Sequence, residues 1–181
     1  MIIFGIDPGS DRTGYGCVDS DGSRHRLVTC GAIKTKASAT FPEKLLVIHS
    51  RLTTLLSECR PDAVAIENVF FSVNVRSALK LGHARGVAML AAVEAGVPVA
   101  EYTPAEIKRS VVGYGRAEKA QVQQMIKVIL RLDEAPSPHD AADALAVAVC
   151  HIHSQPPGRL AGRLSAARAR KTATSWRQYR P

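Results

Sequence analysis

The chain has 181 residues, of which 46% are hydrophobic and 22% are charged, and its formal net charge at pH 7 is +8. This composition is typical of a soluble globular chain with one domain and enough apolar residues for a real core. No run of about 18 apolar residues occurs, and the apolar N-terminus reaches an acidic residue too early for a signal peptide. We therefore expect a cytoplasmic protein that does not enter a membrane.

The positive charge is concentrated at the C-terminal end of the chain. Residues 155–181 contain seven basic residues and no acidic one, whereas residues 1–154 have a net charge of only +1. The C-terminal segment begins with QPPGR and is rich in Pro, Gly, Ala and Ser. We predict a folded domain over residues 1–154 and a disordered basic arm over residues 155–181. This arm either follows a polyanion or is a dispensable solvated tail, and its charge alone does not establish nucleic-acid binding.

The cysteines indicate no metal site and no disulfide framework, because they form no C-x-x-C pair. They are Cys17, Cys30, Cys59 and Cys150. We expect them to pack as small, buried apolar residues.

The first part of the chain predicts a meander of three strands. The run MIIFGID, ended by Pro8 and Gly9, has the apolar and β-branched residues of a buried strand. The segments TGYGCVDS and RHRLVTCGAIKT predict the second and third strands, with a hairpin turn from Ser20 to Gly22.

The rest of the chain alternates helices and strands before it ends in helices. Apolar spacing predicts a helix over residues 41–59, a strand from Ala63 to Glu67, a long Gly- and Ala-rich helix over 72–96 and a strand over 97–102. Three further helices are predicted, one opening at Thr103 with a capping box, one over 118–132 and one over 140–153. The order predicts an α/β domain with a mixed five-stranded sheet flanked by helices on both faces.

Acidic residues stand at unusual places in this pattern. Asp7 and Glu67 each end an apolar strand, where a carboxylate is costly to desolvate unless it is paired or binds a cation. Asp140 and Asp143 are three residues apart and share a helix face. If the two strands are parallel neighbours, their carboxyl ends lie at one sheet edge, and all four acids can converge there.

Such a cluster repels itself unless a cation neutralises it, and oxygen ligands favour Mg²⁺ or Mn²⁺ over zinc. Each acid also has a simpler explanation. Asp7 suits an Asx turn, and Glu67 suits a surface position at the end of a strand. Asp140 suits a helix cap, and Asp143 suits the first turn of a helix, where the helix dipole favours an acidic residue. Because four separate explanations are then needed, the spacing favours the metal site.

Five segments resemble the RuvC family of Holliday-junction resolvases. They are GIDPGSDRTGYG, AIENVFF, SALKLGHARGVAM, VVGYGRAEKAQVQQM and DAADALAVA, they occur in the family's order, and they lie within residues 1–153. The resemblance implies a ribonuclease-H-like fold and a homodimer. It also implies a Mg²⁺-dependent endonuclease that resolves four-way DNA junctions by paired nicks in recombination and repair.

Carried over by motif, the resemblance assigns Asp7, Glu67, Asp140 and Asp143 to the catalytic metal site. It implies two Mg²⁺ ions, replaceable by Mn²⁺, which activate the attacking water and stabilise the departing 3′ oxygen. Some members of the family have His in place of the first Asp of the last pair. Here His139 is one position away, so it is either a loop or cap residue or a proton-transfer group.

Basic and aromatic residues are the candidates for DNA contacts. Lys108 and Lys119 match basic positions of the family, and Phe70 matches an aromatic residue used at the junction centre. Phe71 either joins it or packs in the core. The further basic candidates, for which a solvated surface is the alternative, are Arg76, Lys80, Arg85 and Arg116.

The resemblance also implies partners and leaves rivals. The long helix allows close approach of a second copy in a homodimer, and the family works with the branch-migration helicase complex of RuvA and RuvB, for which no surface can be assigned from the sequence. The rival functions are an RNA-processing nuclease of the same fold and a non-catalytic junction-binding protein. The complete set of acids argues against the second rival, and the VFF loop with the long helix argues against the first.

Overall fold

A computed structural model describes residues 1–68 and 74–155 of the chain. Its centre is a five-stranded sheet in the order β3-β2-β1-β4-β5. β1 pairs antiparallel with β2 and parallel with β4, which confirms the predicted mixed sheet. The strands are β1 (Ile2–Asp7), β2 (Arg12–Ser20), β3 (His25–Lys34), β4 (Ala63–Glu67) and β5 (Val99–Tyr102).

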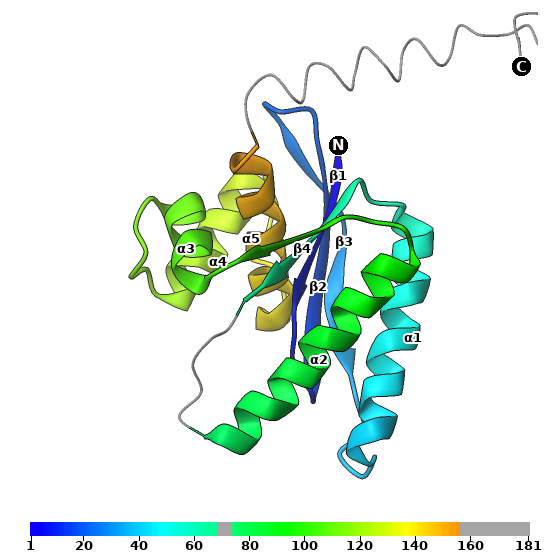
Figure 1. Cartoon of the computed structure of the whole chain (residues 1–181). Helices are drawn as coiled ribbons and strands as arrows, with labels where there is room; N and C mark the ends of the chain where they lie inside the picture. Colours follow the sequence, from blue (N-terminus) through cyan, green and yellow to red (C-terminus); the bar gives the residue numbers. More distant parts are fainter. Residues whose placement is uncertain (69–73, 156–181) are drawn as a thin grey trace, which may run out of the picture.

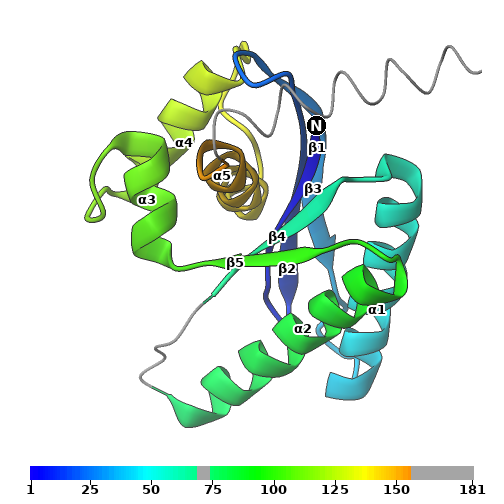
Figure 2. The same ribbon diagram turned by 45° about the horizontal axis from the view of Figure 1, so that its top comes forward.

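The helices cover both faces of the sheet, as predicted (Figure 1). α1 and α2 pack on one face, and α5 lies on the other, where α3 and α4 cover it (Figure 2). Each face therefore has its own hydrophobic core. The helices are α1 (Phe41–Cys59), α2 (Val75–Glu94), α3 (Pro104–Val112), α4 (Lys119–Ile129) and α5 (His139–His153).

Several element boundaries differ from the predicted ones. The hairpin connection occupies residues 21–24 rather than a turn from Ser20 to Gly22, because the Asp21 carboxylate accepts hydrogen bonds from the next backbone amides and widens the loop. α2 begins at Val75, after the side chain of Asn74 caps its first amides. The predicted capping box of Thr103 and Glu106 is confirmed at the start of α3.

Helix α5 lies unusually close to the sheet because glycines face it. A Cβ atom added to Gly5 of β1 would lie 2.0 Å from the carbonyl oxygen of Ala144, and one added to Gly14 of β2 would lie 2.0 Å from that of Asp140. Only residues without a side chain leave this space. The close approach brings the first turns of α5 next to the end of β1.

The predicted burial of the cysteines is confirmed for two of the four. Cys17 and Cys150 are buried as predicted, but Cys30 and Cys59 are only partly buried. None of the helices described is long and apolar enough to cross a membrane. Apart from Gln155, the predicted arm lies outside the described residues.

Candidate active site

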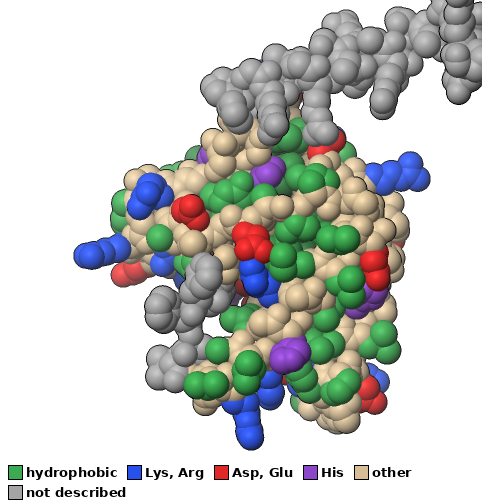
Figure 3. Space-filling view, in the orientation of Figure 1, with side chains coloured by type: hydrophobic (Ala, Val, Ile, Leu, Met, Phe, Trp, Pro, Cys, Tyr) green, Lys and Arg blue, Asp and Glu red, His purple; other side chains and the backbone are tan. Residues whose placement is uncertain are grey.

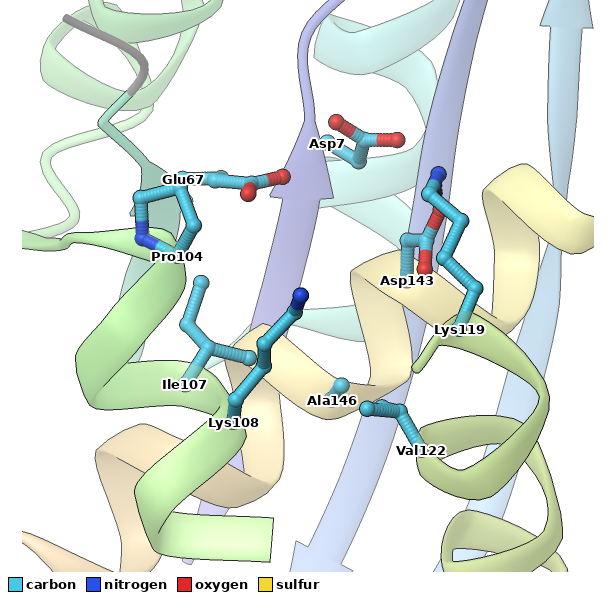
Figure 4. Close-up of a pocket in the computed structure, with 9 residues that line it drawn as sticks. All are labelled: Asp7, Glu67, Pro104, Ile107, Lys108, Lys119, Val122, Asp143 and Ala146. Carbon is cyan, nitrogen blue, oxygen red and sulfur yellow. Dashed lines mark hydrogen bonds and ion pairs between the residues drawn. The ribbon is translucent and has the colours of Figure 1, made fainter. Parts of the chain in front are cut away.

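Two acidic residues meet where β1 and β4 end. The parallel register pairs Ile6 with Ile66. The next residues, Asp7 and Glu67, are the last residues of the two strands, so they lie side by side at one edge of the sheet. Figure 4 shows their carboxyl groups directed toward one another at the rim of a pocket. The pocket is lined by Asp7, Glu67, Pro104, Ile107, Lys108, Lys119, Val122, Asp143 and Ala146.

Burial raises the pKa of both strand-end carboxyl groups. For Asp7, desolvation, the charge of Glu67, a hydrogen bond with Glu67 and the charge of Asp143 together raise the pKa to about 8. For Glu67, desolvation is also the main cause of a raised pKa, whereas its hydrogen bond with Asp7 acts in the opposite direction. These raised pKa values favour a proton shared by the pair at neutral pH when no metal ion is bound.

Asp143 is the third acid at the pocket. It comes from the second turn of α5, and its Oδ2 accepts a hydrogen bond from Lys119 Nζ at 2.8 Å. This hydrogen bond is the main cause of a raised pKa of Lys119, so the lysine stays charged. Lys108 of α3 extends its amine toward the same pocket, as Figure 4 shows. The pocket thus combines three acids with two lysines.

Asp140 and His139 lie outside this group. Asp140 does not line the pocket, and its Oδ2 lies 3.9 Å from Nη1 of Arg12. It is not the N-cap either, because that position belongs to Pro138. His139 is the exposed first residue of α5 and also does not line the pocket. Among residues 1–68 and 74–155, no three His, Cys, Asp or Glu side chains are assembled as a ready set of metal ligands.

The predicted DNA-binding residues lie in different environments. Arg76 and Lys80 are exposed near the start of α2, and Arg116 is exposed in the loop between α3 and α4. Lys80 Nζ also lies 5.9 Å from the centre of the Phe41 ring. Phe70 and Phe71 lie outside the described residues.

Arg85 has a partner within the fold. Its Nη2 lies 2.5 Å from Oε2 of Glu101 on β5, and the same oxygen accepts a hydrogen bond from Asn68 Nδ2 at 3.2 Å. Asn68 directly follows Glu67. Arg85 therefore ties α2 to the strand ends that carry the site, which does not leave its guanidinium free on the surface.

Several residues of this region were not predicted from the sequence. Pro104, Ile107 and Val122 form the apolar wall of the pocket, and Arg12 contacts Asp140. The apolar wall had a signal in the sequence, since Pro104 opens a capped helix and the other two are apolar residues on predicted helices. Arg12 had none, because its partner is 128 residues away in the chain.

The arrangement suits a hard divalent cation. Its donors are carboxylate oxygens without sulfur. The charge of Lys119, and for Glu67 also that of Lys108, acts to lower the pKa values of the Asp7–Glu67 pair, but both stay raised, so the pair retains a proton when no metal ion is bound. A divalent ion that replaces this proton would relieve the repulsion between the acids. The adjacent lysines suit an anionic substrate, so the site can act on phosphate esters.

Comparison with known proteins identifies the family. The family model described as "Crossover junction endodeoxyribonuclease RuvC" matches residues 3–151. A protein with that name from Ruminiclostridium cellulolyticum is 54% identical over 162 residues, which cover 90% of this chain and 98% of the relative. Another, from Pelobacter propionicus, is 52% identical over the full length of both chains, 181 residues.

Solved structures agree with this assignment. T. thermophilus RuvC, in complex with a Holliday junction substrate, is 36% identical with a TM-score of 0.77, and the match covers 91% of this chain and 96% of that one. The yeast mitochondrial Holliday junction resolvase Ydc2 is only 13% identical, with a TM-score of 0.59 over 92% of this chain and 85% of that one. This more distant likeness concerns the fold alone. The T. thermophilus structure and this likeness together bear out the predicted ribonuclease-H-like fold. The chain belongs to the RuvC family of crossover junction endodeoxyribonucleases.

Proposed function

We propose that this chain resolves Holliday junctions by hydrolysing one phosphodiester bond in each of two opposed strands, with Mg²⁺ or Mn²⁺ at the pocket between β1, β4 and α5. Its family is one of nucleases, which implies the use of a divalent metal ion. The observation that carries the proposal is the pair of desolvated carboxyl groups of Asp7 and Glu67, whose pKa values are raised beside Asp143 and two lysines.

The acids of the pocket would hold the metal. Asp7 and Glu67 supply oxygen ligands from the strand ends, and Asp143 supplies one from α5. Asp140, from the preceding turn of α5, is the fourth proposed ligand. When bound, a pair of such ions supplies a water of lowered pKa and stabilises the charge on the departing 3′ oxygen.

The lysines of the pocket orient the DNA strand. Lys119 balances the charge of Asp143, and Lys108 brings a second ammonium group to the same cavity. In this proposal both contact non-bridging oxygens of the scissile phosphate. The exposed Arg76, Lys80 and Arg116 suit phosphates of the junction arms. The insertion of Phe70 at the junction centre stays a prediction.

The outer surface of α2 supports a homodimer. Val75, Leu79, Leu90 and Val93 are 74%, 60%, 51% and 66% exposed. Gly82 and Gly86 lie on the same stripe, and a Cβ added to either would meet nothing within 4 Å. Figure 3 shows hydrophobic side chains over the face that α2 occupies. We infer that two copies pack through this stripe, which would present two sites to a two-fold junction.

A synthetic four-way junction tests the activity. Wild-type protein with Mg²⁺ should nick two opposed strands, and EDTA should abolish nicking. Asp7→Asn keeps the size of the side chain but cannot lose a proton to become a carboxylate ligand, and we expect it to lower the rate by about 1000-fold or more, about 4 kcal/mol of transition-state stabilisation. Wild-type protein that binds the junction but never nicks it would refute the activity. Full activity of Asp7→Asn would refute only the metal site.

A charge on the α2 stripe tests the dimer. Leu79→Glu should shift the mass in solution from two chains to one and remove coordinated nicking, because a carboxylate cannot be buried there without a partner. Val128→Glu is the matched control, since Val128 is similarly exposed, at 68%, on α4. A monomeric wild type, or a dimer that survives Leu79→Glu, would contradict this interface. The contact with the RuvA and RuvB helicase complex remains a prediction without an assigned surface.

A further inference from the structure

Two basic residues lie opposite each other on β2, the antiparallel neighbour of β1, and on β3, the next strand. Arg12 opens β2 and Lys34 closes β3, and the antiparallel register places them directly opposite one another. Residues opposite one another in such a ladder project from the same face. Gly14 and Gly16 of β2 face α5, so the two-residue period puts Arg12 and Lys34 on the α5 face as well.

Both side chains are available to a ligand. Arg12 is 59% exposed, and its only ion pair in the described part of the chain is the 3.9 Å contact with Asp140. Lys34 is exposed and makes no ion pair within residues 1–68 and 74–155. The nearest acid of the β1–β2 loop, Asp11, is already neutralised by Lys44 at 2.5 Å. A surface pair as long as that of Arg12 is weak, so a phosphate can compete with Asp140 for the guanidinium.

The Arg12–Lys34 pair lies next to the pocket but on its other side. Asp7 is the register partner of Gly14, two residues from Arg12. Of the two lysines of the pocket, Lys108 of α3 lies on the side of Glu67, whereas Lys119 of α4 lies beside Asp143 (Figure 4). Lys108 and the Arg12–Lys34 pair therefore approach Asp7 from different sides. A strand whose scissile phosphate lies at Asp7 continues from the pocket toward either flank.

We propose that Arg12 and Lys34 form a second phosphate subsite, which holds a phosphodiester of the cleaved strand next to the scissile one. This inference rests on the proposed function, since it assumes DNA at the pocket. The guanidinium of Arg12 donates to the non-bridging oxygens, and the ammonium group of Lys34 adds charge without fixed geometry. Because Arg12 also contacts Asp140, occupancy of the subsite removes a competing cation from this acid.

Salt dependence of junction binding gives the first test. Binding of the full chain to a synthetic junction is measured in EDTA over a range of NaCl concentrations. Arg12→Gln and Lys34→Gln should each reduce the slope of log affinity against log salt by about one, as for the loss of one phosphate contact. Arg26→Gln is the matched control, because Arg26 makes a similar ion pair with Asp19 at the opposite end of the same two strands, at 3.1 Å. This control should leave the slope unchanged.

A neutral phosphate gives the second test. Single methylphosphonate linkages are placed at successive positions on either side of the scissile phosphate. At one neighbouring position, the modification should weaken wild-type binding severalfold, and Arg12→Gln should then weaken it no further. If the effects of Arg12→Gln and of every neutral linkage simply add, or if the salt slopes equal that of wild type, the subsite is refuted. Wild-type protein that neither binds nor nicks the junction would instead refute the proposed function.

Discussion

Helices α5 and α2 are both rich in small residues, yet they use them in opposite ways. In α5 the small side chains face inward, where Ala144 and Ala148 pack against the bare backbone of Gly5. In α2 four alanines are buried, Ala84, Ala88, Ala91 and Ala92, but Gly82 and Gly86 are exposed, and a Cβ added to either would meet nothing within 4 Å in the described part of the chain. α5 packs its small residues against the sheet, whereas α2 exposes an apolar stripe to solvent.

The difference shows that the structural effect of a small residue depends on what packs against it. Against the sheet, it allows α5 to approach closely and carries Asp143 toward Asp7. On the surface, the same residue type leaves room for a second helix, which fits the proposed dimer. Substitution of glycine by alanine should therefore have opposite consequences in the two regions.

The largest expected effect is that of Gly5→Ala. The new methyl group would lie 2.0 Å from the carbonyl oxygen of Ala144 and 2.8 Å from the amide nitrogen of Ala148, so α5 has to move away from the sheet. We expect a loss of about 3 kcal/mol in the free energy of unfolding, measured with urea. Because α5 carries Asp143, nicking should fall even under conditions where the variant stays folded. An unfolding curve equal to that of wild type would show that the close approach is not required.

A smaller effect concerns the buried carboxyl group of Asp7 and the pH dependence of stability that it causes. The pKa of Asp7 is raised from 3.8 to about 8 in the folded chain, so the folded state binds more protons than the unfolded state between these values. Without metal, the free energy of unfolding should therefore fall as pH rises from 5 to 8, on the order of 2 kcal/mol. Added Mg²⁺ should restore the loss most strongly at the higher pH.

The comparison with Asp7→Asn isolates this effect from other titrations. Burial lowers the pKa of His25 and of His151, so these histidines make the protein more stable as pH rises through their range. They remain in both proteins. The difference in unfolding free energy between Asp7→Asn and wild type should therefore increase with pH. Parallel pH profiles of the two proteins would mean that Asp7 is not the group that holds the proton.

The smallest expected effect is that of Gly86→Ala in α2. In a chain made monomeric by Leu79→Glu, the added methyl group meets nothing, and the better helix propensity of alanine should stabilise it by up to about 1 kcal/mol. In the dimeric chain the same substitution should weaken association, because the methyl group would enter the proposed interface. Equal effects in the two backgrounds, measured by urea unfolding and sedimentation, would argue that Gly86 does not face a partner.

The sequence predicted most of the fold and part of the candidate site. The element order, the mixed sheet and the meeting of Asp7 with Glu67 follow from local periodicity and from the rule that parallel strand ends share an edge. The spacing of Asp140 and Asp143 predicted a shared face, but only Asp143 lines the pocket. The two acids lie on successive turns of α5, and their spacing in the sequence does not show which turn reaches the pocket.

By itself, the sequence determined which segments form strands and helices, which acids end the strands, and which family the chain resembles. Only the tertiary structure decided the partners of charged residues. Arg85 pairs with Glu101 and Arg12 pairs with Asp140, and neither ion pair was predicted from the sequence. The physical reason is that hydrophobic periodicity specifies the face on which a side chain lies, whereas ion pairs depend on contacts between segments far apart in the chain.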